Sequence, residues 1–224
     1  MKIGETIFHS NKFQKVRQAV ETAERKVFAG RMISASPAYD PQFFPTAAGR
    51  HAIYSPVSPY PFLLWVETLN PAPGGLFIDW GSGFGKICFL AAELNIFSRI
   101  IGYEKDGEIL AEAESVRTSF GYEKVSFIGG DFTKQPVPGP IGRAPSVIYT
   151  YQPFFDRFVS QVKPVLLETE PGTTVIATLT SPDYFQIFPR DSFARLPDSE
   201  LIKRSRIRTR AYQRLSLTTS PSSL

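Results

Sequence analysis

Residues 77–85 read Phe-Ile-Asp-Trp-Gly-Ser-Gly-Phe-Gly, and this stretch decides the fold. The apolar run at 76–79 predicts a short buried strand, and KICFLAAEL at 86–94 predicts a buried helix. The glycines between them allow a tight turn whose backbone a ligand can approach closely. The helix that follows directs its free N–H groups and positive dipole end to the same place. The stretch therefore predicts a strand–turn–helix unit that binds a nucleotide-like ligand.

Apolar strands and helices alternate on the C-terminal side of this turn. We expect strands at 99–104, 124–132, 146–151 and 173–179, with helices at 107–121 and 155–167. Such alternation is typical of a doubly wound parallel sheet with right-handed crossovers. Residues 205–219 alternate with period two and predict one or two antiparallel strands at the sheet edge. The expected fold class is α/β, with a doubly wound, mostly parallel seven-stranded sheet and an antiparallel C-terminal edge.

The N-terminal part has a different pattern. Residues 11–29 carry apolar side chains at three- and four-residue spacing, which predicts an amphipathic helix. Residues 35–59 are rich in proline, alanine, serine and aromatics and predict an ordered loop. A second helix is expected over 60–69, with Pro61 in its first turn. The sheet is therefore preceded by a helical extension.

Composition limits the class of protein. The chain has 224 residues, of which 42% are hydrophobic and 21% charged, as in a globular α/β domain with a small addition. Its single cysteine, Cys88, excludes an intramolecular disulfide and a cysteine-based metal site. His9 and His51 lack nearby carboxylates at ligand spacing, so we expect no metal. No apolar run suits a signal peptide or a membrane span, which predicts a soluble, intracellular, cytoplasmic protein.

Known nucleotide-binding turns narrow the choice of ligand. A P-loop requires GxxxxGK[ST]; Lys86 follows Gly85, but Trp80 stands where the first glycine belongs and Ile87 replaces Ser/Thr. A dinucleotide turn requires GxGxxG, and Lys86 occupies the position of the third glycine. The remaining pattern is GxGxG, preceded two residues earlier by Asp79 at the end of a strand.

This pattern resembles motif I of the class I (Rossmann-like) S-adenosylmethionine (SAM)-dependent methyltransferases. The resemblance extends over residues 54–180 and rests on YSPVSPYPFLLWVETL, LFIDWGSGFGKICFLAAEL, RIIGYEKD, GGDF and YTYQPF. The turn alone is also similar to that of the histone-lysine methyltransferases. The resemblance implies SAM as the cofactor and S-adenosyl-L-homocysteine as its product. It also implies that residues 1–70 form a helical cap or substrate-side extension and residues 71–224 the SAM-binding domain, although a purely structural extension stays open.

The resemblance assigns the cofactor contacts residue by residue. Glu104, at the second strand exit, binds the ribose hydroxyls; Asp131, at the third, accepts from the adenine amino group, and Phe132 packs on the adenine ring. The segment before the first strand lies over the cofactor, where Tyr54, Ser55, Ser58 and Tyr60 contact its methionine end. Glu104 and Asp131 can alternatively be solvated loop acids. The expected cofactor-binding residues are Tyr54, Asp79, Gly81, Ser82, Gly83, Gly85, Glu104, Asp131 and Phe132.

The fourth strand exit is where such enzymes hold the methyl acceptor. It resembles the Asn-Pro-Phe motif of enzymes that methylate nitrogen, with Gln152 in place of asparagine. A glutamine amide offers the same acceptor one methylene further out. A proline loop with core aromatics is the alternative interpretation, and His51 is either a base or a structural residue. The candidates for orienting the acceptor are Tyr149, Tyr151, Gln152, Pro153 and Phe154.

Positive charge gathers near the C-terminus. Residues 190–214 hold eight basic and three acidic residues, a net of +5. In a basic strand over 203–214, Arg206, Arg208 and Arg210 share one face and can bind nucleic acid. No aromatic residues interleave with these arginines, so we favour a solvated edge strand protected by charge. A small molecule or a protein side chain is the favoured acceptor.

These observations predict a SAM-dependent methyltransferase that moves the methyl group by in-line displacement, with nitrogen as the favoured nucleophile. The altered fourth exit leaves open a non-catalytic SAM-fold binding or scaffold protein. A nicotinamide-dependent oxidoreductase on a similar sheet is a further alternative, against which the missing third glycine argues.

Overall fold

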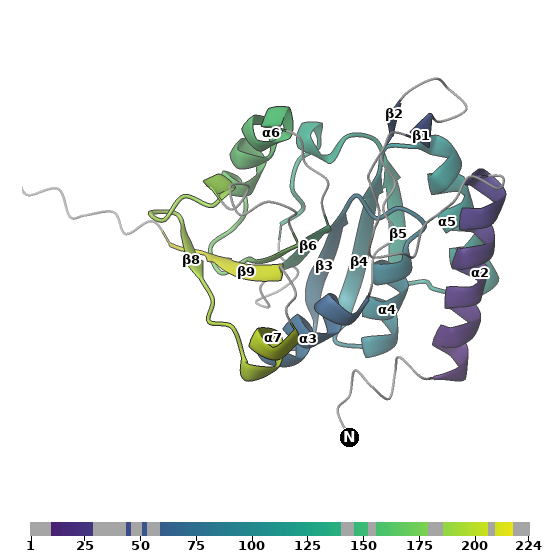
Figure 1. Cartoon of the computed structure of the whole chain (residues 1–224), viewed down its shortest axis with the longest axis horizontal. Coiled ribbons are helices and arrows are strands. Elements are labelled where there is room, and N and C mark those ends of the chain that lie inside the picture. The colour runs from purple at the N-terminus through teal and green to yellow at the C-terminus, as the bar shows by residue number, and fades with distance from the viewer. Residues whose placement is uncertain are drawn as a thin grey trace, which may run out of the picture.

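A computed structural model describes residues 10–28, 44–45, 51–52, 59–139, 146–151, 156–178, 186–205 and 209–216. Its centre is a seven-stranded sheet with helices on both faces (Figure 1). The strands of this sheet are β3 (Gly75–Trp80), β4 (Phe97–Glu104), β5 (Val125–Gly129), β6 (Val147–Tyr151), β7 (Thr174–Thr178), β8 (Phe193–Arg195) and β9 (Thr209–Arg214). The helices are α2 (Asn11–Phe28), α3 (Tyr60–Leu69), α4 (Lys86–Leu94), α5 (Gly107–Ser119), α6 (Asp156–Leu167), α7 (Glu200–Ser205) and the 3-10 turn η1 (Phe132–Lys134). Strands β1 (Phe44–Pro45) and β2 (His51–Ala52) pair antiparallel in a sheet of their own.

The strand order confirms the expected doubly wound sheet. It runs β5-β4-β3-β6-β7-β9-β8, with parallel pairing from β5 to β7. Strand β9 pairs antiparallel with β7, and β8 pairs antiparallel with β9 at the edge of the sheet. The direction of chain progression reverses between β3 and β6. In open α/β sheets, ligands bind outside the carboxyl ends of the strands at such a switch point.

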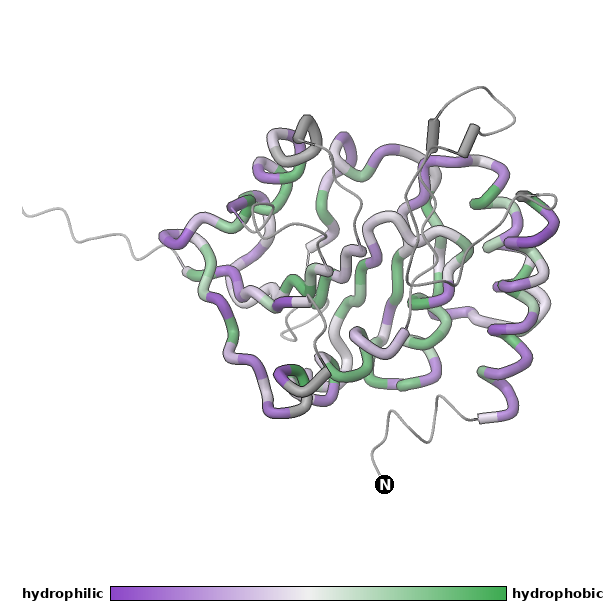
Figure 2. The backbone as a smooth tube through the Cα atoms, in the orientation of Figure 1, coloured by the Kyte–Doolittle hydropathy of each residue, from purple (hydrophilic) through white to green (hydrophobic). Residues whose placement is uncertain are grey.

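Alternation along the strands divides the core into two layers. On one face, Phe77 of β3 packs with α3, α4 and the apolar stripe of α2. On the other face, Ile78 and Trp80 pack with α6 and with residues 187–193. Figure 2 shows the hydrophobic residues concentrated on the central strands and hydrophilic ones along the outer side of α2. Side chains of consecutive strand residues therefore meet different helices.

Helix α2 packs on the outside of α4 and α5. Its buried residues Phe13, Val16, Val20 and Ala23 follow the predicted stripe and belong to the same core cluster as α3 and α4. Three ion pairs accompany this packing. They are Lys12–Glu93 at 2.8 Å, Lys86–Glu24 at 3.4 Å and Lys26–Glu112. The division of the chain into 1–70 and 71–224 stays a prediction.

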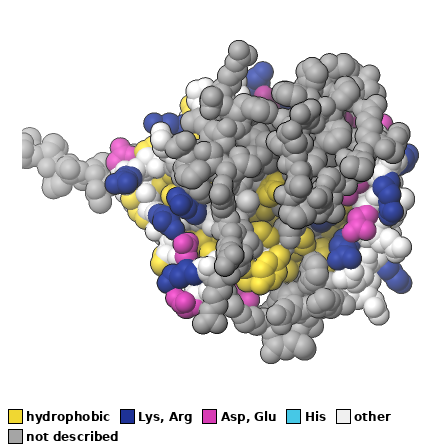
Figure 3. All heavy atoms as spheres, in the orientation of Figure 1, with side chains coloured by type: hydrophobic (Ala, Val, Ile, Leu, Met, Phe, Trp, Pro, Cys, Tyr) yellow, Lys and Arg dark blue, Asp and Glu magenta, His cyan; other side chains and the backbone are white. Residues whose placement is uncertain are grey.

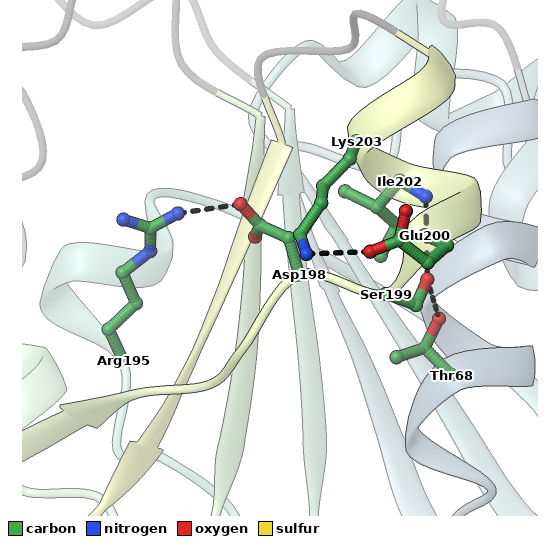
Figure 4. A network of polar contacts seen from close by, with 7 residues as sticks. All are labelled: Thr68, Arg195, Asp198, Ser199, Glu200, Ile202 and Lys203. Atoms are coloured by element: carbon green, nitrogen blue, oxygen red, sulfur yellow. Dashed lines mark hydrogen bonds and ion pairs between the residues drawn. The ribbon is translucent and has the colours of Figure 1, made fainter.

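The C-terminal edge differs from the expectation in its second strand. One strand was expected to begin near residue 205, but β9 begins at Thr209, and its antiparallel neighbour β8 comes from the preceding segment. Lys203, expected in a basic strand, lies instead on α7, where it pairs with Glu200. Figure 4 shows how this helix is anchored: the Ser199 hydroxyl contacts Thr68 of α3 at 2.9 Å. Strand β8 has only three residues, which are too few to show the alternating pattern by which a strand is recognised in the sequence.

None of the helices in the described part of the chain is long and apolar enough to cross a bilayer.

Candidate functional site

The glycine turn is fastened to the neighbouring strand β4. Gly81, Gly83 and Gly85 have φ values of 81°, 54° and 80°, which favour glycine. The backbone N–H groups of Gly81 and Ser82 both donate to the Tyr103 carbonyl, at 3.0 and 2.8 Å. A Cβ built on Gly81 would meet no atom within 4 Å. The turn is therefore held to β4 by two hydrogen bonds, whereas the position that a Cβ on Gly81 would take is open.

Glu104 links the turn to the next helix. Its Oε2 accepts from the Gly83 N–H at 2.9 Å, and its Oε1 accepts from the Asp106 N–H at 2.8 Å. Burial raises the pKa of the Glu104 carboxyl, and the backbone N–H bonds of Asp106, Gly83 and Lys105 offset only part of that effect. The Glu104 carboxylate, the predicted partner of the ribose hydroxyls, thus has a fixed orientation at the carboxyl edge of β4.

Asp131 is the N-cap of η1 and lies two residues after the end of β5. Its Oδ1 accepts from the Thr133 N–H at 3.1 Å and from the Thr133 hydroxyl at 2.7 Å. Burial alone would raise the pKa of Asp131, but these bonds and the charges of Lys105 and Lys134 together lower it. Asp131 is therefore an ionised carboxylate at the exit of β5, as its predicted role requires.

Phe132 has an aromatic partner that the sequence pattern does not indicate. Its ring stacks on Trp80, with centroids 4.8 Å apart and planes inclined by 10°. Trp80 comes from the end of β3 and Phe132 from η1, so the pair joins two strand exits. Trp80 therefore holds the ring of Phe132, on which the adenine ring is predicted to pack.

Asp79 lies in the core on the other face of β3. Only 3% of its surface is exposed, and its Oδ2 accepts from the Cys88 thiol of α4 at 3.7 Å. Burial raises the pKa of Asp79 to about 8, and the charge of Glu104 adds to the shift. Tyr149 of β6 is paired with Asp79 in register and is fully buried against the ring of Phe62. Its own pKa is raised by burial and by the charge of Asp79.

The structure brings the three strand exits of the predicted cofactor site together at one edge of the sheet. Tyr151 ends β6 at the same edge, whereas Tyr60 is the half-exposed first residue of α3. Several predicted residues lie outside the described part of the chain: Tyr54, Ser55, Ser58, Gln152, Pro153 and Phe154. For His51, the structure describes the backbone of β2 and no side chain.

The sequence analysis includes Ser82 among the cofactor contacts but does not include the Thr150 hydroxyl or the partner of Lys86. Within the described residues, the hydroxyls of Ser82 and Thr150 are buried without a hydrogen-bond partner, both near the carboxyl edge. Lys86, the residue that resembled a P-loop lysine, turns toward Glu24 of α2, and both side chains are largely buried. The strand register places Thr150 beside Trp80, but the Lys86–Glu24 pair has no local sequence signal. Across the described segments, no three His, Cys, Asp or Glu side chains gather as metal ligands.

One family model matches part of the chain. Residues 72–139 match the family model described as "Methyltransferase domain". No curated protein matches the sequence. The matched residues include the glycine turn, Glu104 and Asp131 and end before β6.

Several solved structures share the fold. The putative methyltransferase yhhF from Escherichia coli is 10% identical with a TM-score of 0.54, covering 69% of this chain and 82% of that one. TrmN from Thermus thermophilus is 17% identical with a TM-score of 0.53, covering 69% and 49%. An RNA methyltransferase from Salinibacter ruber, solved in complex with S-adenosyl-L-homocysteine, is 19% identical with a TM-score of 0.50, covering 76% and 99%. The chain spans about half the length of some structures it matches, TrmN among them.

Proposed function

We propose that this chain carries a class I methyltransferase domain and that the protein is a SAM-dependent methyltransferase. The observation that carries the proposal is the Glu104 carboxylate, held by the N–H groups of Gly83 and Asp106 at the topological switch point. SAM supplies a methyl group activated on a sulfonium. The protein contributes binding and alignment, which are the larger part of catalysis when the donor is already activated.

The residues at the three strand exits suit this cofactor. Glu104 Oε2 accepts from the Gly83 N–H and Oε1 from the Asp106 N–H, and carboxylate oxygens have further lone pairs that can accept from a ribose hydroxyl. Both bonds to Asp131 use Oδ1, so Oδ2 can accept from the adenine amino group. Phe132, backed by the buried ring of Trp80, can pack on adenine, and no atom lies within 4 Å of the position that a Cβ on Gly81 would take.

Replacing Glu104 by glutamine is expected to lower the affinity for S-adenosyl-L-homocysteine by about 10- to 100-fold. A bond to a charged group contributes roughly 1.5–3 kcal/mol, and the glutamine NH₂ also faces a backbone N–H. Because the pKa of Glu104 is raised, the affinity of the wild type should increase as pH rises through that pKa, and the variant should lose this dependence. Isothermal titration calorimetry measures both effects.

Glu108→Gln, on the exposed first turn of α5, is the matched control and should bind like the wild type. Equal affinity of Glu104→Gln and the wild type would remove the main support for the proposed cofactor site.

For the acceptor, we propose a nitrogen atom of a nucleic acid. Support for nitrogen comes from the sequence Tyr151-Gln152-Pro153-Phe154, in which an amide and a backbone carbonyl can hold a target amine. Some proteins of similar fold are described as RNA methyltransferases, which supports a nucleic-acid acceptor. This differs from the sequence-based preference for a small molecule or protein side chain.

Methyl-tritiated SAM can test the acceptor with cell extract separated into RNA, protein and small-molecule fractions. We expect label in the RNA fraction, and mass spectrometry of the digested nucleosides should place the methyl group on nitrogen. Gln152→Ala should reduce this transfer, and Gln152→Asn should retain more of it, while neither changes the affinity for S-adenosyl-L-homocysteine. A methyl group found on oxygen or carbon contradicts the nitrogen assignment.

A further inference from the structure

A basic pocket lies on the flank of the sheet away from β5. It has a volume of about 470 Å³ and is formed by β8, β9 and the segment 186–190. Arg190, Arg195 and Arg210 line it, and none of its described lining residues is acidic. Figure 3 shows Lys and Arg side chains on this side of the molecule, beside hydrophobic and some acidic ones. The pocket thus carries three arginines that the methyltransferase site does not use, one of which, Arg195, pairs with Asp198 beside the pocket.

Aromatic rings form the floor of this pocket. Phe188 and Tyr212 stack with centroids 4.0 Å apart and planes inclined by 4°, and Phe193 packs edge-on against Phe188 at 5.5 Å. All three rings are buried in the second core layer. The arginines therefore stand on a rigid apolar base, in contrast to flexible cations on a polar surface.

Strand register connects the pocket to the methyltransferase site. Arg210 pairs with Ala177 of β7, which pairs with Thr150 of β6, which pairs with Trp80 of β3. Neighbouring strands are about 4.8 Å apart, so Arg210 lies roughly 10 Å from the β6 row and roughly 14 Å from Trp80. This row of paired residues crosses the strands in the carboxyl half of the sheet. The pocket consequently lies within reach of a chain whose target group is held at the exit of β6.

Arginine and an apolar floor together suit a phosphate-bearing strand. The guanidinium fork binds phosphate through two N–H groups, and it does not lose its charge at any physiological pH. Arg195 donates to Asp198 at 2.7 Å, a bond that uses one of its five N–H groups and fixes its position. Figure 4 shows the two side chains pointing toward one another. A positively charged groove that follows the phosphate backbone is typical of proteins that bind single-stranded nucleic acid.

We propose that this pocket binds the phosphate backbone of a single-stranded RNA segment adjacent to the methylated nucleotide. The inference deepens the proposed function, since it specifies how the acceptor of that reaction is held. The sequence pattern did not indicate it, because the aromatic residues come from 188–193 and 212, not from positions between Arg206, Arg208 and Arg210.

Fluorescence anisotropy with a short labelled RNA of mixed sequence tests the proposal in the absence of cofactor. Arg190→Gln/Arg195→Gln/Arg210→Gln should weaken binding by about tenfold or more, and the slope of log K against log salt should fall by about 2, at roughly 0.7 per lost phosphate contact. The control Lys15→Gln/Arg25→Gln/Arg99→Gln removes the same charge from exposed positions elsewhere and should bind RNA like the wild type. Arg190→Gln/Arg195→Gln, at two exposed positions, keeps the test valid if the triple variant folds poorly.

Two further measurements separate the possible outcomes. Calorimetry with S-adenosyl-L-homocysteine should give the same affinity for the pocket variants and the wild type. If the wild type did not bind S-adenosyl-L-homocysteine at all, the proposed function would be contradicted, but the result of the RNA-binding experiment would still stand. Labelled poly-glutamate should bind at least about tenfold more weakly than RNA. Equal binding of both polymers, or an unchanged salt slope in the triple variant, would overturn the assignment of this pocket to RNA.

Discussion

Replacing Gly85 by alanine is expected to destabilise the protein by about 2–5 kcal/mol and to abolish binding of S-adenosyl-L-homocysteine. The φ of +80° costs an L-residue about 1–2 kcal/mol, and overpacking costs about 1–3 kcal/mol more. The added Cβ would lie 2.4 Å from Phe127 Cζ and 3.0 Å from Phe89 Cε2. Urea denaturation measures the loss of stability and calorimetry the loss of binding.

Gly81→Ala separates the two parts of this effect. Gly81 has nearly the same φ, +81°, but its Cβ would meet no atom within 4 Å. We therefore expect Gly81→Ala to cost only the conformational term, about 1–2 kcal/mol. Its Cβ would nevertheless enter the open space above the turn, so the affinity for S-adenosyl-L-homocysteine should still fall. Equal stabilities of the two variants would contradict the steric part of the argument.

Phe127 supplies a second test of the same contact. Its ring also approaches Gly102, where a Cβ would lie 2.6 Å from Phe127 Cδ1, and it packs edge-on against Phe89. The ring is therefore confined between two glycines and cannot move aside without losing other contacts. Gly85→Ala/Phe127→Leu should recover the steric part of the lost stability relative to Phe127→Leu alone, but not the part that comes from φ.

The elements of the fold were predictable because they follow from local patterns. The Gly81–Gly85 turn, the flanking β3 and α4, and the amphipathic stripe of α2 each depend on residues close in sequence. The antiparallel edge was recognised from β9, whose alternation spans six residues, whereas β8 has only three. Local periodicity thus identifies an element only when the element is long enough to show it.

Contacts between distant residues were not predictable in the same way. The Trp80–Phe132 stack and the Lys86–Glu24 ion pair join segments tens of residues apart, and no local rule couples them. Strand parity does explain one difference: Asp79 faces α4 and the adjacent Trp80 faces the α6 layer. Adjacent residues of one motif are therefore both buried but belong to different core layers, on opposite faces of β3.

Asp79→Asn is expected to remove a strong dependence of stability on pH. The pKa of Asp79 is about 8 in the folded protein, whereas its ordinary value is 3.8. Between these values the unfolded chain has released a proton that the folded protein still binds, so stability falls as pH rises, by up to about 1.4 kcal/mol per unit. The neutral amide has no proton to release, and the Cys88 thiol can still donate to its oxygen.

Urea denaturation of both proteins at several pH values gives the quantity of interest, the difference in stability between variant and wild type. This difference should grow in favour of Asp79→Asn from pH 4 to pH 8 and become constant above it. Parallel stability curves for the two proteins would show that Asp79 is ionised in the fold.

Two neighbours of Asp79 extend the test because they shift its pKa in opposite directions. The hydrogen bond from Cys88 lowers it, so Cys88→Ala should carry the pH dependence to higher pH. The negative charge of Glu104 raises it, so Glu104→Gln should end the dependence at lower pH. Because the Glu104 carboxylate also holds the Gly83 and Asp106 N–H groups, the same substitution would then alter cofactor affinity and core titration together. That coupling is expected only if Asp79 and Glu104 share one electrostatic environment at the end of the sheet.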